Sequence, residues 1–314
     1  MAMQISGVTI QGGMNILPAG GAPSPTPGGV SDGYTSGGAD ISDTKYSTIQ
    51  SFPFSSDGNA SDVGNLSAII NGQASQSSTT SGYSSGGYGT GFSDVIDKFP
   101  FASSTSGTDV GNITSARSVA AGNSSADNGY ISGGALGGII EKFPFASDGN
   151  SASVGNLSQD RGYAAGQNSS SHGYNSGGHD RSPANTGPVN TIDKFPFASD
   201  GNATDVGDLT INRQSPAGQS SSDNGYASGG WPVDTIDKFP FSSDSNSSDI
   251  GDLTLLRTRA AGQSSAASGY TSGGFATPTL LSNVIDKFPF SSDGNATDVG
   301  DLTASLQFLG GHQG

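Results

Sequence analysis

The chain lacks cysteine altogether and has a single glutamate, Glu141. Without cysteine it has no disulfide framework, no zinc–thiolate site and no cysteine nucleophile. Glutamate, lysine, leucine and methionine, which favour helices, are all scarce, and this scarcity argues against a helical protein. No stretch approaches the roughly 18 consecutive apolar residues of a membrane-spanning helix. The sequence therefore predicts no membrane insertion.

Positive charge is also scarce, because 12 Lys and Arg stand against 27 Asp and Glu, for a net charge of −15. Binding of nucleic acid depends on neutralising phosphates with Lys and Arg, so this balance argues against a nucleic-acid partner. Glycine is abundant instead, at 50 of 314 residues. A core built from small side chains and closely spaced backbones is compatible with that composition.

Three motifs each occur six times and define an internal repeat. The first is Gly-Tyr-x-Ser-Gly-Gly, the second is Phe-Pro-Phe, and the third is Val/Ile-Gly-Asn/Asp-Leu/Ile-Ser/Thr. Successive Phe-Pro-Phe motifs are 47, 44, 52, 44 and 49 residues apart. A period of about 47 residues is typical of β-propeller blades. The tyrosines of the first motif are Tyr34, Tyr83, Tyr130, Tyr174, Tyr226 and Tyr270.

Each repeat divides into four short strand-like runs separated by clusters of Ser, Asp, Asn and Gly. In one unit these runs are residues 217–221, 225–228, 235–241 and 248–254. Proline cannot donate to a β-ladder, so Phe-Pro-Phe is expected at a strand end or a bulge. The sequence predicts an all-β fold, a six-bladed β-propeller of four-stranded blades.

The two ends of the chain are expected to complement one another. Aligned on the preceding repeat, Gly311 matches Gly262 and His312 matches Gln263, so the C-terminal segment is a first strand. The N-terminal repeat lacks a clear first strand and begins at Gly33. We therefore expect the C-terminal strand to join the N-terminal blade and close the propeller. Residues 1–29 form an N-terminal arm and linker, and residues 30–314 form the propeller.

The order of these motifs resembles the kelch repeat. Tyr226-Ala227-Ser228-Gly229-Gly230 is similar to the double-glycine strand of that family, which implies a propeller fold. Four arginines stand where kelch repeats often carry Arg, namely Arg117, Arg161, Arg213 and Arg257.

The amino-acid sequence of the repeats also resembles that of predicted structural proteins of marine bacteriophages. The stretch KFPFASDGNATDVGDLT, together with AGQSS and GYTSGG, carries this likeness. It implies a structural protein located in the virion.

Recognition is expected on the links between the second and third strands, because these vary from repeat to repeat whereas the turns after Phe-Pro-Phe are nearly uniform. Variable loops on a rigid scaffold commonly carry function. Aromatic side chains beside polar loops suit a cell-surface glycan or protein receptor. The alternative is ordinary loop variation without a ligand. The candidate residues are Tyr88, His179, Arg181, Trp231 and Phe275.

The N-terminal arm differs from the repeats. It carries Ile5, Val8, Ile10 and Ile16 among glycines, and a Pro/Gly-rich linker follows it. Such linkers hold a module away from its anchor. The hypothesis is that the arm adds a strand to other virion proteins, and the alternative is a disordered tail.

Metal binding and catalysis have weaker support. Asp200, Asn202, Asp205 and Asp208 have a spacing that would suit calcium, which takes oxygen ligands. Turn formation explains Asp and Asn equally well, so no metal or other cofactor is assigned. A propeller hydrolase or lyase would need His179 and neighbouring acids to converge.

Lysines that recur after an acidic residue are interpreted as solvated strand-edge positions that discourage aggregation. They are Lys98, Lys142, Lys194, Lys238 and Lys287.

The function predicted from the sequence is a non-enzymatic phage virion structural protein, either a capsid decoration protein or a tail or fibre component. Its propeller would be displayed for attachment or particle interactions. The alternative is a carbohydrate- or protein-binding adhesin of a cell surface.

Overall fold

The computed structural model describes residues 31–102, 106–135, 137–276 and 280–314. Over these ranges the chain is all-β, with 29 strands and no helix. None of the described segments could cross a membrane as a long apolar helix.

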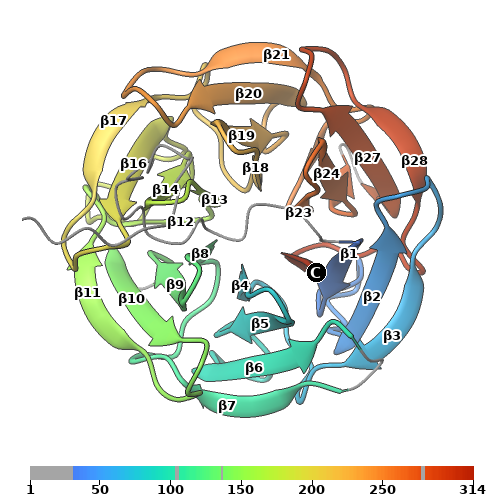
Figure 1. The fold of residues 1–314 in the computed structure, drawn as a ribbon, viewed down its shortest axis with the longest axis horizontal. Coiled ribbons are helices and arrows are strands. Elements are labelled where there is room, and N and C mark those ends of the chain that lie inside the picture. The colour runs from blue at the N-terminus through green and yellow to red at the C-terminus, as the bar shows by residue number, and fades with distance from the viewer. Residues whose placement is uncertain (1–30, 103–105, 136, 277–279) are drawn as a thin grey trace, which may run out of the picture.

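The described residues form six four-stranded antiparallel sheets, which Figure 1 shows arranged around a common centre. We number these sheets 1 to 6 along the chain. Their first strands are innermost: β29 (Gly310–Gln313), β4 (Ala74–Ser77), β8 (Ala121–Ser124), β13 (Ala165–Asn168), β18 (Ala217–Ser220) and β23 (Ala261–Ser264). The second strands are β1 (Asp32–Ser36), β5 (Ser81–Ser85), β9 (Asn128–Ser132), β14 (His172–Ser176), β19 (Asn224–Ser228) and β24 (Ser268–Ser272).

The third strands all end at the proline of Phe-Pro-Phe, as expected for a residue that cannot donate to the ladder. They are β2 (Thr48–Pro53), β6 (Val95–Pro100), β10 (Ile139–Pro144), β16 (Thr191–Pro196), β20 (Thr235–Pro240) and β27 (Val284–Pro289). The fourth strands lie at the outer rim: β3 (Ser61–Asn65), β7 (Thr108–Asn112), β11 (Ala152–Asn156), β17 (Thr204–Asp208), β21 (Ser248–Asp252) and β28 (Thr297–Asp301).

Sheet 1 is assembled from both ends of the chain, because β29 pairs antiparallel with β1. The pairing runs from Gly33 opposite Gln313 to Ser36 opposite Gly310. The predicted pairing of the C-terminal strand with the N-terminal repeat is therefore confirmed.

Aromatic side chains join each sheet to the next. Tyr130 of sheet 3 lies 5.6 Å from the Phe195 ring and 4.8 Å from the Phe197 ring, both of sheet 4. Tyr270 of sheet 6 packs in the same way on Phe52 and Phe54 of sheet 1. Each aromatic ring buries on the order of 150–250 Å², so these contacts supply much of the core between sheets.

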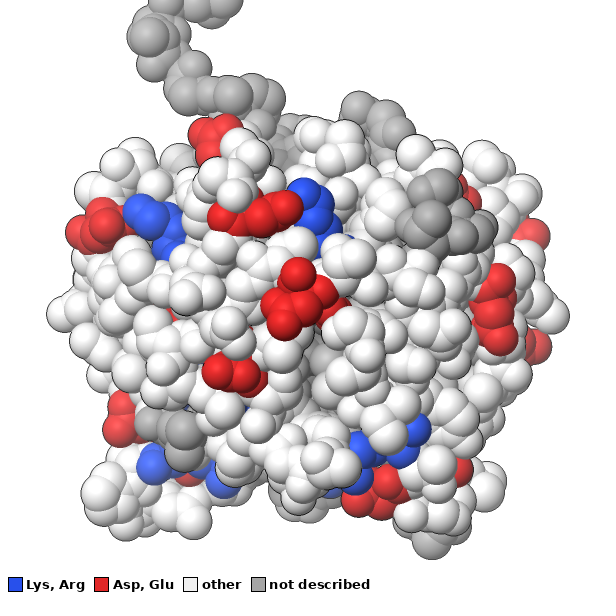
Figure 2. Space-filling view, turned by 90° about the horizontal axis from the view of Figure 1, so that it is seen from below, with Lys and Arg blue, Asp and Glu red and all other residues white. Residues whose placement is uncertain are grey.

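Two kinds of ion pair add to these contacts. A buried pair holds the link before a first strand against the third strand of the same sheet, as where Arg161 Nη2 lies 3.0 Å from Asp193 Oδ2. The recurrent lysines form the second kind, so their interpretation as solvated strand-edge positions was wrong. Each of them reaches an aspartate of the next sheet: Lys98–Asp148, Lys142–Asp200, Lys194–Asp244, Lys238–Asp293 and Lys287–Asp57. Blue and red atoms accordingly lie next to one another in several places in Figure 2.

The antiparallel order gives the molecule two different faces. The turn face carries the turns between first and second strands and between third and fourth strands. The loop face carries the links between second and third strands, and the links from each fourth strand to the next sheet. Short strands pair these links with one another in two places. In the first, β12 (Arg161–Gly162) pairs with β15 (His179–Asp180). In the second, β22 (Arg257–Thr258) pairs with β25 (Phe275–Ala276), which also pairs with β26 (Leu280–Leu281).

Candidate functional site

The first strands surround the centre of the molecule and contact one another through backbone atoms. Gly166 lies so close to the preceding first strand that an added Cβ would stand 2.0 Å from the carbonyl oxygen of Gly122. Gly218, Gly262 and Gly311 have the same relation to the first strand before theirs. Because only glycine permits this approach, the repeated glycine of the first strand sets the narrow spacing around the axis.

A cyclic set of backbone hydrogen bonds lies at the loop-face end of this arrangement. The residue two places before each first strand has a positive φ of 55–63°. Its N–H donates to the carbonyl of the equivalent residue in the sheet before, and the last bond returns to the first sheet. Five of the six residues are not glycine, although this conformation costs an L-residue roughly 1–2 kcal/mol. The six axial residues are Gly72, Val119, Tyr163, Ser215, Arg259 and Phe308.

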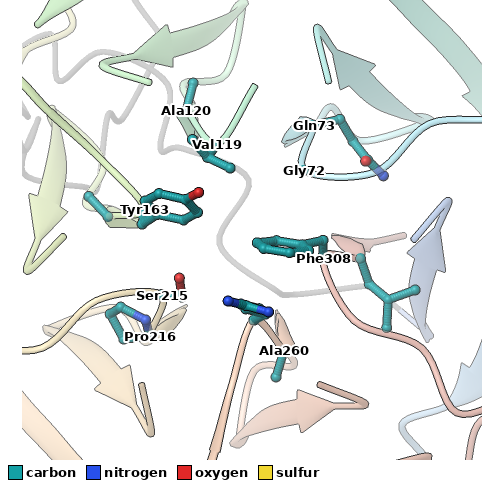
Figure 3. A pocket seen from close by; sticks show the side chains of 12 residues that line it. Gly72, Gln73, Val119, Ala120, Tyr163, Ser215, Pro216, Ala260 and Phe308 are labelled. Carbon is teal, nitrogen blue, oxygen red and sulfur yellow. The ribbon is translucent and has the colours of Figure 1, made fainter. Parts of the chain in front are cut away.

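The axial residues line a pocket of about 100 Å³ on the loop face. Figure 3 shows the Tyr163 and Phe308 side chains pointing toward one another across it, with Val119 and Ser215 between them along the wall. None of the described residues that line this pocket is acidic.

Four side chains from separate parts of the chain form a row of contacts, and three of them line the pocket. The Arg181 guanidinium carbon lies 4.9 Å from the centre of the Tyr163 ring, and that ring lies 6.2 Å from the Phe308 ring. The Arg259 guanidinium carbon is 4.6 Å from the centre of the Phe308 ring. Phe275 extends the row, with its ring centre 5.8 Å from the same guanidinium. Arginine stacks well on aromatic faces and keeps the edges of its guanidinium free to donate hydrogen bonds.

The two arginines of this stack differ from every other basic residue of the chain. All 12 Lys and Arg fall within the described ranges. Ten of them form an ion pair with an aspartate or glutamate. Arg181 and Arg259 form none with any described carboxylate, and the one side-chain hydrogen bond of Arg259 goes to the neutral Gln307 Oε1, at 2.9 Å. One of these two unpaired arginines, Arg259, lines the axial pocket, and the other, Arg181, lies against the Tyr163 ring that lines it.

The structure places the five candidate residues on the loop face, but it brings together only some of them. Arg181 and Phe275 belong to the axial stack. His179 lies in β15, where its Nδ1 is 2.9 Å from the backbone oxygen of Asp180. Trp231 is 47% exposed and is held by backbone hydrogen bonds in both directions with Gln214. Within the described part of the chain, no ring contact or side-chain hydrogen bond joins Tyr88, Trp231 or His179 to the stack.

Tyr88 is the centre of a second aromatic group. Its ring meets Phe92 edge-on at 5.4 Å, and Lys45 Nζ lies 5.2 Å from the ring centre. Both aromatic side chains are exposed. Ile69 of the neighbouring link is exposed too, and its backbone oxygen would be 2.8 Å from a Cβ at Gly89. This group gives the loop face a second apolar area, separate from the residues that line the pocket.

Tyr163, Arg259 and Phe308 are the site residues that the sequence reasoning missed. The signal was present in the repeat, because the residue two places before each first strand is Gly, Val, Tyr, Ser, Arg or Phe. The four residues that follow it vary far less. A variable position inside a nearly constant motif indicates a residue that the scaffold does not need.

Three of the four residues considered for calcium have protein partners for a side-chain oxygen in the structure. Asp200 pairs with Lys142, and Asn202 Oδ1 accepts a hydrogen bond from the N–H of Asn156. Asp205 Oδ1 accepts one from the N–H of Gly207. These contacts are those of turns and of links between sheets. Among the described residues, no group of three His, Asp or Glu could hold a metal ion.

The proposed assembly residues Ile5, Val8, Ile10 and Ile16 lie outside the described residues. No protein-family model matches the chain, and no curated protein matches it either.

Proposed function

We propose that the chain is a closed, six-bladed, kelch-like β-propeller. Three sets of contacts run from sheet to sheet and return to the first sheet, and they support this proposal. The six axial hydrogen bonds run through all six sheets, and the Tyr–Phe contacts lead from sheet 6 back to sheet 1. A further set of hydrogen bonds at the other end of the first strands also runs through all six sheets. It follows the order Ser77, Ser124, Asn168, Ser220, Ser264 and Gln313, and then returns to Ser77.

The function that this architecture supports best is a non-enzymatic binding and display module that recognises its target through the loop face. One observation carries the proposal. All nine large hydrophobic side chains that are exposed among the described residues lie in links of the loop face or at the strand end beside them. A concentration of exposed apolar groups on one side of a soluble protein marks an interaction surface. They are Ile41, Ile69, Tyr88, Phe92, Ile139, Ile211, Trp231, Leu255 and Leu280.

We further propose that the module belongs to a phage particle, as a capsid decoration protein or a tail or fibre component. The likeness of the repeats to phage structural proteins supports this assignment. In this proposal residues 1–29 join other virion proteins and the propeller faces outward. The alternative function is a surface adhesin, which would use the same loop face but reside on a bacterial cell.

Two measurements test these proposals. Mass spectrometry of purified particles should detect the chain at a constant ratio to the major capsid protein if it is a virion component, and only in cell envelopes if it is an adhesin. Adsorption of the purified chain to host cells should fall at least tenfold in a Trp231→Ala, Tyr88→Ala double variant. The control is Lys238→Ala on the turn face, which should adsorb like the unmodified chain. Equal losses in both would contradict a binding role for the loop face.

A further inference from the structure

The axial pocket has the features of a site for one small anionic group. Among its described lining residues only Arg259 carries a formal charge, and this arginine is not paired with a described carboxylate. Arg181, which is also unpaired, lies against the Tyr163 ring but is not a lining residue. Arginine presents a planar fork that matches a carboxylate in a two-point contact, and such charge-assisted hydrogen bonds are the strong ones. In a chain of net charge −15, an unpaired arginine in the wall of an aromatic pocket is not explained by the needs of the scaffold. The ten paired cations serve those needs.

The aromatic rings add a second requirement for the ligand. Tyr163 and Phe308 face the pocket with rings that are only partly buried. A ligand that satisfies both features needs an acidic group and an adjoining apolar face. A sugar ring that carries a carboxylate has both, because its C–H bonds form an apolar face that packs on aromatic rings.

The size of the pocket restricts how such a ligand enters. A volume of about 100 Å³ is well below the roughly 300–1,000 Å³ of sites that enclose a whole drug-sized ligand. Only the acidic group and the edge of one sugar ring would fit. The pocket therefore suits the end or a branch of a glycan, which enters along the axis.

The net negative charge of the protein also favours entry of only the end or a branch of a glycan. The strongly acidic surface repels a polyanion, and charges farther than about 8 Å are screened at physiological ionic strength. Attraction is thus confined to the group that reaches Arg259. Additional acidic residues along the glycan would contribute no further affinity at this site.

We propose that the axial pocket binds a carboxylated sugar residue at the end or branch of an acidic glycan. Arg259 holds the carboxylate, and Tyr163 and Phe308 pack against the sugar ring. This inference rests on the proposed binding role of the loop face and names the ligand class for its centre. A single contact of this size gives a Kd of about 1 mM. Many copies on one particle would bind together with a much higher avidity.

The test is a ligand-observed NMR titration of the full chain with glucuronic acid, glucose, inorganic phosphate and an Asp-Glu dipeptide. Glucuronic acid is expected to bind at least tenfold more tightly than the other three. A glucuronate-containing tetrasaccharide should match the single sugar to within threefold per site. Arg259→Gln should weaken binding about tenfold. Arg181→Gln, which removes an equal charge outside the pocket lining, should weaken it less than about threefold. Arg259→Lys keeps the charge but loses the planar guanidinium fork. Its affinity should therefore lie between those of Arg259→Gln and the unmodified chain. Lys238→Gln removes the same charge from the turn face and should change nothing.

Several results would overturn the assignment. Binding of phosphate or the dipeptide at least as tight as that of glucuronic acid would make the pocket a general anion or peptide site. Absence of glucuronate binding, or equal binding by Arg259→Gln with an unchanged melting temperature, would also refute it. Adsorption to host cells distinguishes this failure from that of the proposed function. A chain that adsorbs through Trp231 and Tyr88 but ignores glucuronic acid refutes the ligand class alone.

Discussion

The rings of Tyr163 and Phe308 meet over the centre of the molecule, with their centroids 6.2 Å apart. These residues precede β13 and β29, which stand opposite one another in the order in which the first strands make contact. The pocket therefore depends on segments from the middle and the end of the chain, held at the correct distance by the narrow axis. Substitutions at the contacts that keep this arrangement have distinct expected effects.

Gly166→Ala should strongly destabilise the fold. The new Cβ would lie 2.0 Å from the carbonyl oxygen of Gly122, so two first strands would have to move apart. Overpacking of this kind costs about 3 kcal/mol or more, because backbone rather than a flexible side chain must shift. Urea unfolding measures the change. Gly201→Ala is the matched control: no atom lies within 4 Å of the place that its methyl group would take, and a change of less than about 0.5 kcal/mol is expected. Equal effects would show that the first strands are not in close contact.

Asp97→Asn should stabilise the protein at neutral pH. Asp97 is buried in sheet 2 at the position where Asp193 pairs with Arg161, but Ile70 stands in place of the arginine. Its Oδ2 accepts a hydrogen bond from the N–H of Ser67, and its Oδ1 has no partner. Burial raises the pKa of this carboxyl. The folded state thus holds the proton more tightly than the unfolded chain, and stability is lost as the pH rises through the folded pKa.

The neutral amide removes this penalty, and a gain of about 1 kcal/mol in the free energy of unfolding at pH 7 is expected. Asp193→Asn is the comparison, because it leaves Arg161 buried without its partner and should cost about 3–5 kcal/mol. If the two substitutions change stability in the same direction, the difference between paired and unpaired sites is refuted.

His312→Gln should remove part of the loss of stability in acid. His312 is fully buried in β29, and burial lowers its pKa from 6.5 to about 4. Its ring contacts Ser36 Oγ, the backbone oxygen of Gln76 and the edge of Phe99, with no charged group among them. Between these pH values the unfolded chain takes up a proton that the folded chain does not. The free energy of unfolding therefore falls by about 3 kcal/mol as the pH drops from 6.5 to 4.

Glutamine is a suitable replacement because it occupies this position in β23, where Gln263 Nε2 donates to the carbonyl of Tyr34. Carboxylates elsewhere also titrate in acid, so the quantity to measure is the difference between the variant and the unmodified chain at each pH. Relative to the unmodified chain, the variant should become progressively more stable as the pH falls below 6.5. A constant difference from pH 7 to pH 4 would contradict the assignment.

The strands could be predicted from the sequence because each repeat carries its own turn residues. Residues 235–241 were expected as a third strand, and β20 covers Thr235–Pro240. The motif that begins at Gly33 also marked the repeat that lacks a first strand. Repetition made these predictions possible, since every local signal was read six times.

The centre of the site could not be predicted in the same way. Arg259 and Phe308 are adjacent because their repeats meet at the axis, and no local pattern carries that information. The axial hydrogen bonds also need a positive φ at residues such as Val119 and Tyr163, which local propensity disfavours. The hydrogen bonds between sheets that select this conformation exist only in the assembled fold.

The loop face and the axial pocket both depend on the proposed closed arrangement of the six sheets. Its most direct test removes residues 306–314, and with them β29, Phe308 and the buried Leu306 and Leu309. We predict a loss of at least about 5 kcal/mol, or oligomerisation through the open sheet, because two buried leucines alone contribute that much. A synthetic peptide of residues 304–314 should then restore the melting temperature and the monomer. A truncated chain that stays monomeric and melts like the full chain would contradict the closed arrangement.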